Sequence, residues 1–285
     1  MSEKSSNFAA IMDFRQLTYR VWSWVKFQLT AWNTGGEGVH SPYLFEWVRM
    51  VMSDRHRYYS WDLIEDCRRK MLEDTRELHY VDYGSGSRGV KGRESVRRVC
   101  DVARSSLTNR RYAEMLSRLV NWLGGQQRTR DAGLKIIELG TSLGITTSYL
   151  ATVDRRDRVT TYEGCEAVAS LARCNWESLG LTNIDCVVGE IDVDVLGADK
   201  SLFDIAFVDA SHTYASTRAF FNMLVGRVHE KSVIIIDDIH YSTEMERAWL
   251  EICADERVTS TMDLYQMGLV FFDRRYWRRN YKMRL

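Results

Sequence analysis

A glycine-bearing turn at residues 138–144 has the residue types and spacing that most clearly suggest chemistry. It reads Glu138-x-Gly140-x-x-x-Gly144, follows an apolar strand-like run and leads into a helical one. Glycines let a backbone turn sharply and approach a ligand, and a helix N-terminus offers free N–H groups. A second acid, Glu163, ends the next apolar run, where a nucleotide-binding half-domain places its acceptor for ribose hydroxyls. The pattern predicts a nucleoside-cofactor site.

A second glycine-rich segment, Gly84 to Gly89, matches the dinucleotide fingerprint G-x-G-x-x-G. That fingerprint needs a strand before it, and a helix and a second strand after it. After Gly89 the sequence instead reads as helical almost without break to Leu123, and the acid nearest the required distance, Asp101, falls inside that run. We therefore interpret this segment as a glycine-rich turn that could fold over the site, rather than as the main cofactor loop.

The region after a polar boundary loop at 124–133 alternates between strand and helix patterns. Strand-like runs cover 135–139, 158–163, 184–188, 203–208, 232–237, 258–264 and 267–273. Such alternation predicts an α/β domain with a parallel sheet covered on both faces. Only two residues join the last two runs, so these must be antiparallel neighbours. We expect two parts: a helical amino-terminal region, 1–123, and an α/β domain, 134–285.

The carboxyl ends of the first five predicted strands all carry polar residues. In open parallel sheets, ligands bind beyond these ends. A single acid there is commonly a helix N-cap, but five polar ends together favour a ligand site. The residues are Gly140, Thr141 and Ser142; Glu163; Gly189 and Glu190; Asp209 and His212; and Asp237, Asp238 and His240.

Composition and charge are those of an ordinary cytosolic enzyme. Lys and Arg number 39 and Asp and Glu number 39, so overall charge indicates neither a nucleic-acid nor a membrane partner. The six cysteines form no C-x-x-C pair and no metal-ligand cluster. No apolar run approaches the roughly 18 residues needed to cross a bilayer. We expect a cytoplasmic protein with reduced cysteines.

Two segments depart from this average. The tail at 274–285 carries six Arg or Lys, no acid and three interleaved aromatics, a pattern that can bind RNA but more often docks its aromatics on the protein. Residues 14–32 form an amphipathic pattern that we expect to pack on its own domain rather than on a membrane surface. The apolar positions of that pattern are Leu17, Val21, Trp24, Val25 and Leu29.

With these motifs placed, the sequence resembles the class I S-adenosylmethionine-dependent methyltransferases, specifically the small-molecule (catechol/caffeoyl-CoA-like) O-methyltransferase branch. Segments 136–147, 203–212 and 233–239 are similar to that branch's first, fourth-strand and fifth-strand motifs. The resemblance covers about residues 105–273. It implies a Rossmann-like seven-stranded sheet of order 3-2-1-4-5-7-6, with strand seven antiparallel, beside the helical amino-terminal extension.

The resemblance also implies a site for S-adenosyl-L-methionine. Glu138 and the turn after it would surround the methionine and sugar portions, Glu163 would bind the ribose, and Gly189 and Glu190 would flank the adenine. The full implied set is Glu138, Gly140, Thr141, Ser142, Gly144, Glu163, Gly189, Glu190 and Asp209.

Catalysis in the metal-dependent members of that branch uses a divalent ion held by an Asp after strand four and an Asp-Asn pair after strand five. The matching residues are Asp209, Asp237 and Asp238, with Asp238 in place of Asn. Three carboxylates suit Mg²⁺, but Ser-His stands where those enzymes have Asp-Lys, so the metal stays open. Without a metal, His212 or His240 is the natural base. We predict Asp209, His212 and Asp237 as catalytic.

The sequence as a whole predicts O-methylation of a small molecule. Two alternatives stay open: an RNA or protein methyltransferase that uses the basic tail, and a non-catalytic cofactor-binding regulatory protein. The amino-terminal region is expected to supply specificity through its turn-rich segments, 38–42 and 84–93. Arg88, Lys91 and Arg93 could attract an anionic substrate, but we favour the interpretation that they are solvated surface charges. The acceptor is not indicated, and an oligomer is compatible with the sequence.

Overall fold

The structure, a computed structural model, describes residues 2–31, 36, 38–82, 93–191, 196, 201–274 and 278–285, with side chains from residue 16 onward except those of 82 and 93. The glycine-rich turn at 84–89 and the side chains of Arg88, Lys91 and Arg93 lie outside these residues. Tyr276 and Trp277 of the tail also lie outside them.

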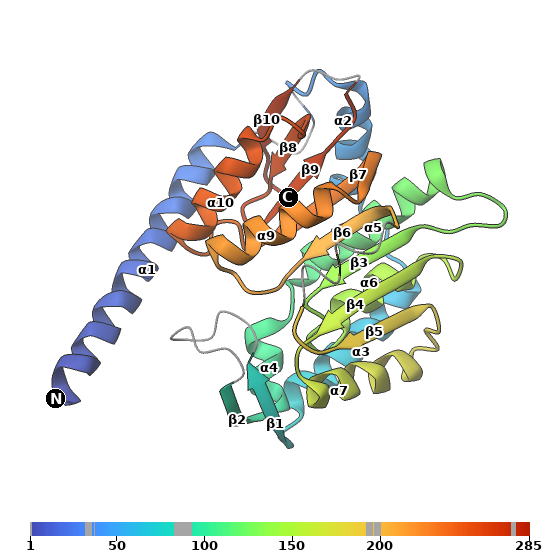
Figure 1. The fold of residues 1–285 in the computed structure, drawn as a ribbon. Helices are drawn as coiled ribbons and strands as arrows, with labels where there is room; N and C mark the ends of the chain where they lie inside the picture. Colours follow the sequence, from blue (N-terminus) through green and yellow to red (C-terminus); the bar gives the residue numbers. More distant parts are fainter. Residues whose placement is uncertain are drawn as a thin grey trace.

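A mostly parallel sheet forms the centre of the α/β domain (Figure 1). Its strands are β3 (Lys135–Leu139), β4 (Arg158–Glu163), β5 (Ile184–Val188), β6 (Phe203–Val208), β7 (Val228–Asp237), β8 (Ser260–Asp263), β9 (Met267–Phe271) and β10 (Arg279–Lys282). They lie in the order β10-β8-β9-β7-β6-β3-β4-β5, and β9 is antiparallel to both neighbours. Counted from β3, this is the predicted order 3-2-1-4-5-7-6 with strand seven antiparallel. That prediction is confirmed.

Helices cover both faces of this sheet because successive side chains of its buried strands point to opposite sides. Ile235 packs in one apolar cluster with α5 (Arg110–Gln127) and α6 (Ile145–Ala151). Its neighbour Ile234 packs in a second cluster with α9 (Tyr214–Val225) and α10 (Thr243–Ala254). A further helix, α7 (Glu166–Ser178), follows β4. The result is a three-layered domain that holds the carboxyl ends of the strands at one edge.

The basic tail adds an eighth strand that the sequence did not predict. β10 pairs in parallel with β8 at the edge of the sheet, and Tyr281 and Met283 are buried. Arg278 donates to the carbonyl oxygens of Cys253 and Asp255. The expectation that tail aromatics dock on the protein is confirmed for Tyr281.

The amino-terminal region contains helices and one hairpin. Its elements are α1 (Ser2–Thr30), α2 (Pro42–Trp47), the π-helical η1 (Val48–Met52), α3 (Tyr59–Glu73), β1 (Glu77–Asp82), β2 (Arg93–Arg98) and α4 (Val99–Ser106). The prediction of helix from Gly89 to Leu123 was wrong over β2, because this segment satisfies its backbone groups by antiparallel pairing with β1. An antiparallel β2 still gives residues 84–89 no dinucleotide-binding unit, which needs a parallel second strand.

Helix α1 lies beside α10 (Figure 1), but not through the predicted apolar face. Phe27 and Ser23 are buried, and the Tyr19 hydroxyl donates to Glu246 of α10 at 2.8 Å. The helix therefore packs on its own domain by another face, which polar contacts to α10 fix. The prediction was wrong for the five apolar positions, which are exposed: Leu17 59 %, Val21 57 %, Trp24 50 %, Val25 43 % and Leu29 82 %.

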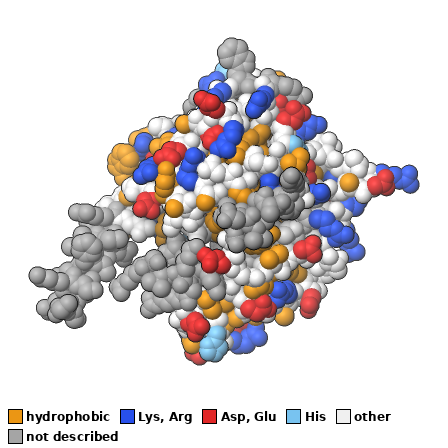
Figure 2. Space-filling view, in the orientation of Figure 1, with side chains coloured by type: hydrophobic (Ala, Val, Ile, Leu, Met, Phe, Trp, Pro, Cys, Tyr) orange, Lys and Arg blue, Asp and Glu red, His pale blue; other side chains and the backbone are white. Residues whose placement is uncertain are grey.

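The charges on the protein surface are mixed, as the equal numbers of acidic and basic residues lead one to expect. On the face shown in Figure 2, acidic and basic side chains are interspersed. Within the described part of the chain, no helix is long and apolar enough to cross a membrane.

Candidate active site

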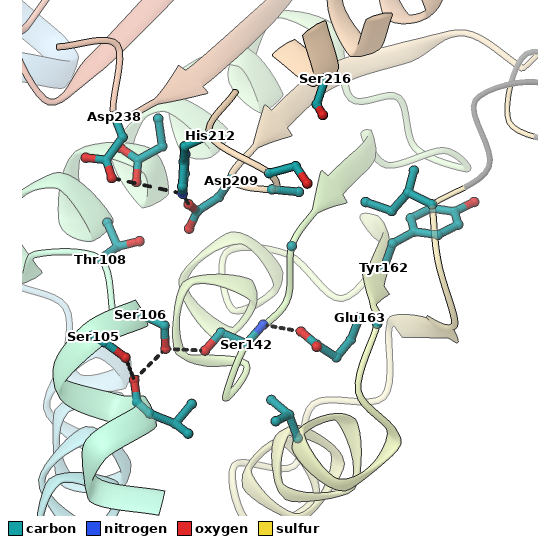
Figure 3. A pocket seen from close by; sticks show the side chains of 18 of the residues that line it. Ser105, Ser106, Thr108, Ser142, Tyr162, Glu163, Asp209, His212, Ser216 and Asp238 are labelled. Atoms are coloured by element: carbon teal, nitrogen blue, oxygen red, sulfur yellow. Dashed lines mark hydrogen bonds and ion pairs between the residues drawn. The ribbon is translucent and has the colours of Figure 1, made fainter. Parts of the chain in front are cut away.

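A cavity of about 520 Å³ lies beyond the carboxyl ends of the central strands (Figure 3). The amino-terminal region closes one side of it with residues 105–108, at the end of α4 and just after it, and with Tyr80 and Val81 of β1. Of the predicted site residues, those that line it are Gly140, Ser142, Glu163, Gly189, Glu190, Asp209, His212, Asp237 and Asp238. The fold thus brings together residues from five strand ends.

Gly140 is required by the geometry of the turn after β3. Its φ is +102°, and a Cβ added there would lie 2.2 Å from the backbone oxygen of Asp209. The N–H groups of Gly140 and Thr141 both donate to the carbonyl of Tyr162 at 3.1 Å. The turn is therefore pressed between the ends of β4 and β6, where a side chain on Gly140 would force them apart.

The Glu163 carboxylate is held at the end of β4 by backbone N–H groups. One oxygen accepts from Ser142 N at 2.8 Å and the other from Cys165 N at 3.0 Å. Burial raises the pKa of Glu163, although these hydrogen bonds oppose the shift. Ser142 also contacts Ser106 of α4, with 2.6 Å between the hydroxyl oxygens (Figure 3). This chain of contacts ties the amino-terminal region to the turn.

Three predicted cofactor residues, Glu138, Thr141 and Gly144, are not among the residues that line the cavity. Glu138 is fully buried, where one oxygen accepts from the hydroxyls of Thr147 and Thr161 and the other has no partner. Burial raises the pKa of Glu138 to about 7. The structure therefore places Glu138 beneath the turn, as part of its support.

Asp209 and Asp237 bring two carboxyl groups to the ends of β6 and β7, where Asp237 is buried and Asp209 is half-buried. Burial, followed by the negative charges of Asp237 and Asp238, raises the pKa of Asp209, and burial, followed by the charge of Asp238, raises the pKa of Asp237. Neighbouring carboxyl groups of like charge resist being ionised together. The other Asp237 oxygen, Oδ1, is buried without a partner. The Asp238 side chain is 34 % exposed.

His212 lies between these acids (Figure 3). Its Nε2 is 3.5 Å from Asp209 Oδ1 and 4.0 Å from Asp238 Oδ2. Burial lowers the pKa of His212 below its ordinary value of 6.5, although Asp238 opposes the shift. The imidazole is therefore neutral near pH 7 and able to accept a proton.

His240 takes a structural place instead. It is buried, its Nε2 lies 2.9 Å from Asp263 Oδ2, and its ring stacks on Tyr265. It is not among the residues lining the cavity. This position agrees with a histidine that orients its loop.

The three acids do not fit a metal ion as they lie. No group of three or more His, Cys, Asp or Glu side chains is placed to hold a metal among the residues whose positions are described.

Sequence reasoning missed the lining residues that come from outside the strand ends. They include Tyr80, Ser105, Ser106, Thr108, Tyr241 and Gln266. Residues 105–108 fall in what reads as continuous helix, so no local pattern marks them. Backbone strain does mark the site: Ser142, Ser211 and Asp238 all have positive φ, between 48° and 54°. Strained non-glycine residues tend to occur at functional sites, but sequence does not reveal them.

Comparison with known proteins agrees with this geometry. Residues 137–239 match the family model of a methyltransferase domain. No curated protein matches the chain. The fold is similar to the SAH-bound methyltransferase PaMTH1 of Podospora anserina (TM-score 0.54, 10 % identity, covering 82 % of this chain and 96 % of that one). It is also similar to a solved structure from Klebsiella pneumoniae (0.52, 13 %, 79 % and 94 %).

A third solved structure, an O-methyltransferase of Bacillus cereus in complex with SAH, has a TM-score of 0.48 at 22 % identity and covers 59 % of this chain and 83 % of that one. The matching domain and the strand order define the class of protein. The chain carries a class I methyltransferase domain and is an S-adenosylmethionine-dependent methyltransferase, as predicted.

Proposed function

We propose that this enzyme transfers the methyl group of S-adenosylmethionine to a hydroxyl of a small molecule, with His212 as general base. The observation that carries the proposal is a neutral imidazole placed in the same cavity as the glycine turn and Glu163. Methyl transfer requires in-line placement of the nucleophile and a base for its proton. The cavity offers residues suited to each requirement.

The cofactor half of the cavity, as we propose it, consists of Gly140, Ser142, Glu163, Gly189 and Glu190. Glu163 is fixed by two backbone N–H groups and can still accept from ribose hydroxyls, because each carboxylate oxygen has two lone pairs. Glu138, Thr141 and Gly144 act from below by holding the turn. Bound there, the cofactor supplies an electrophilic methyl group on a cationic sulfur.

The acceptor half consists of Asp209, His212, Asp237, Asp238 and Tyr241. The acceptor oxygen forms a bond to the methyl carbon as the carbon–sulfur bond breaks, and its proton passes to Nε2 of His212. Neither acid lies within a short hydrogen bond of that nitrogen, so it is free to accept. Asp238 then stabilises the imidazolium. The products are the methyl ether and neutral S-adenosylhomocysteine, and the proton leaves to solvent.

We include no metal in this mechanism, because the described residues place no group of three or more His, Cys, Asp or Glu side chains to hold one. The prediction of a Mg²⁺ site at Asp209, Asp237 and Asp238 remains open to a direct test. With excess chelator we expect unchanged turnover. Loss of turnover that Mg²⁺ restores would support the metal-dependent mechanism instead.

The alternative of an RNA or protein methyltransferase remains a prediction without a specific observation in its favour. The described part of the basic tail is an edge strand, and Lys282 lies 4.0 Å from Asp263. RNA binding with a steep salt dependence, abolished by deletion of 274–285, would favour that alternative.

The proposal is tested by calorimetry with S-adenosylmethionine, followed by transfer assays of labelled methyl groups to a panel of phenols and alcohols. We expect cofactor binding together with transfer to oxygen. No binding at millimolar cofactor would refute the proposed site. Binding without any transfer would point to the regulatory alternative.

A further inference from the structure

The charges that line the cavity are strongly one-sided. Among its described lining residues are five acids and one histidine, and neither Lys nor Arg. The acids are Glu163, Glu190, Asp209, Asp237 and Asp238. This contrasts with the whole chain, where acidic and basic residues are equal in number. A cavity lined by one sign of charge concentrates ligands of the opposite sign.

The negative charge is least balanced around the acceptor half. Asp209, Asp237 and Asp238 all line this half, and the Asp238 side chain is 34 % exposed. His212 is the histidine among the described lining residues, and its Nε2 lies 3.5 Å from Asp209 Oδ1 and 4.0 Å from Asp238 Oδ2. The guanidinium of Arg20 lies 5.1 Å from the centre of the Tyr241 ring. Arg20 is not among the residues that line the cavity.

One carboxylate oxygen in the acceptor half has no hydrogen-bond partner within the protein. Asp237 is 5 % exposed, and its Oδ1 has no hydrogen-bond partner. A buried carboxylate oxygen without a hydrogen-bond partner destabilises the folded protein. Since Asp237 and the partly exposed Asp238 both line the cavity, a donor group that enters the cavity could supply the missing hydrogen bond.

We infer that the acceptor carries an ammonium group as well as the hydroxyl that is methylated, and that Asp238 and the unpaired oxygen of Asp237 select it. This inference rests on the proposed function. An ammonium has three N–H donors and no acceptor, so it can serve both carboxylates. A carboxylate or phosphate on the acceptor would instead meet like charge. Tyr241 and Tyr80 offer aromatic walls for the carbon skeleton.

The test uses three phenols that share one skeleton and differ in terminal charge: tyramine (cationic), tyrosol (neutral) and 4-hydroxyphenylacetate (anionic). Each is titrated by calorimetry into the full-length protein saturated with S-adenosylhomocysteine, in chelator, so that no divalent metal can supply the positive charge. We expect tyramine to bind roughly tenfold or more tightly than tyrosol, as a charge-assisted hydrogen bond would give. We expect 4-hydroxyphenylacetate to bind most weakly.

The variant Asp238→Asn removes one charge and keeps the shape, because asparagine tolerates the positive φ of 54° at this position. It should reduce the preference for tyramine over tyrosol to about twofold or less. The exposed Asp131→Asn, near the opposite ends of the strands, is the matched control and should keep the full preference.

Three results would overturn the inference. They are an anionic phenol that binds as tightly as tyramine, binding of none of the three phenols, and a preference that Asp238→Asn leaves intact. Failure of S-adenosylhomocysteine to bind in the first titration would instead refute the proposed function, so the two failures are distinguishable.

Discussion

The proposed cofactor half of the cavity is shaped mainly by backbone, whereas the acceptor half is shaped by side chains. Gly140 packs against the backbone of Asp209, and the backbone N–H groups of Ser142 and Cys165 hold the Glu163 carboxylate in place. The acceptor half instead depends on how Asp209, His212 and Asp238 lie relative to one another. Backbone shape is carried by one short motif and tolerates little change. Side chains from separate strand ends can be exchanged singly, which makes the acceptor half the place where specificity can vary.

This comparison predicts that the largest effect of a single change in the acceptor half falls on turnover and not on cofactor affinity. We expect His212→Ala to lower kcat about 10²- to 10⁴-fold, the range for loss of a general base, with little change in the Kd for S-adenosylmethionine. For the unaltered protein, kcat/KM should fall as pH drops through the pKa of His212, which burial holds below 6.5. Steady-state kinetics and calorimetry check both.

The exposed His56→Ala serves as the control and should leave kcat unchanged. Equal losses of turnover and cofactor affinity in His212→Ala would mean that the two halves are not separable in this way.

In the cofactor half, Gly140→Ala should weaken S-adenosylmethionine binding roughly hundredfold. The added Cβ meets the Asp209 oxygen at 2.2 Å and the φ of +102° is strained for alanine. Gly125→Ala is the matched control, since nothing lies within 4 Å of its added Cβ and the site is helical. It should bind the cofactor normally and be slightly more stable, by up to about 1 kcal/mol. A Gly140→Ala protein that binds normally would contradict the backbone account.

Beneath the turn, Glu138 is expected to make stability depend on pH. Its folded pKa, about 7, lies above the ordinary 4.5. Its stabilising contribution is therefore complete below about pH 4.5 and is lost as pH rises through about 7, a change of roughly 3 kcal/mol in the free energy of unfolding. Glu138→Gln should remove that slope in denaturant titrations between pH 5 and 8. The exposed Glu177→Gln should keep it, and an unchanged slope in Glu138→Gln would contradict the assignment.

The smallest effect is expected where the amino-terminal region meets the turn. Ser106→Ala removes the hydroxyl contact to Ser142 and should weaken cofactor binding about two- to tenfold, the value of one hydrogen bond. Its neighbour Ser105→Ala is the control, since the Ser105 hydroxyl bonds within α4 and to Arg97. Equal effects of the two variants would show that this contact does not hold the turn.

The difference between local backbone motifs and contacts between distant residues also explains which features could be predicted from the sequence. The strand order and the polar strand ends follow from local patterns, namely apolar runs and the glycine turn, and these were correct from β3 to β9. The edge strand β10 and the hairpin strand β2 were missed, because their charged residues have no apolar signal and form strands only through a partner.

The face of α1 shows the limit of periodicity. Leu17 and Leu29 fit an apolar stripe, yet the helix buries Phe27 and Ser23, and Tyr19 donates a hydrogen bond from α1 to Glu246 of α10. At the site, the burial that keeps His212 neutral and the charge interaction between Asp209 and Asp237 depend on distances between separate strand ends. Such distances cannot be read from a sequence.

The most direct test of the central claim is a crystal structure with bound S-adenosylhomocysteine. We expect the ribose hydroxyls at Glu163 and the sulfur directed toward His212, with room for an acceptor beside Asp238. A cofactor bound elsewhere, or one whose sulfur faces away from His212, would contradict the account.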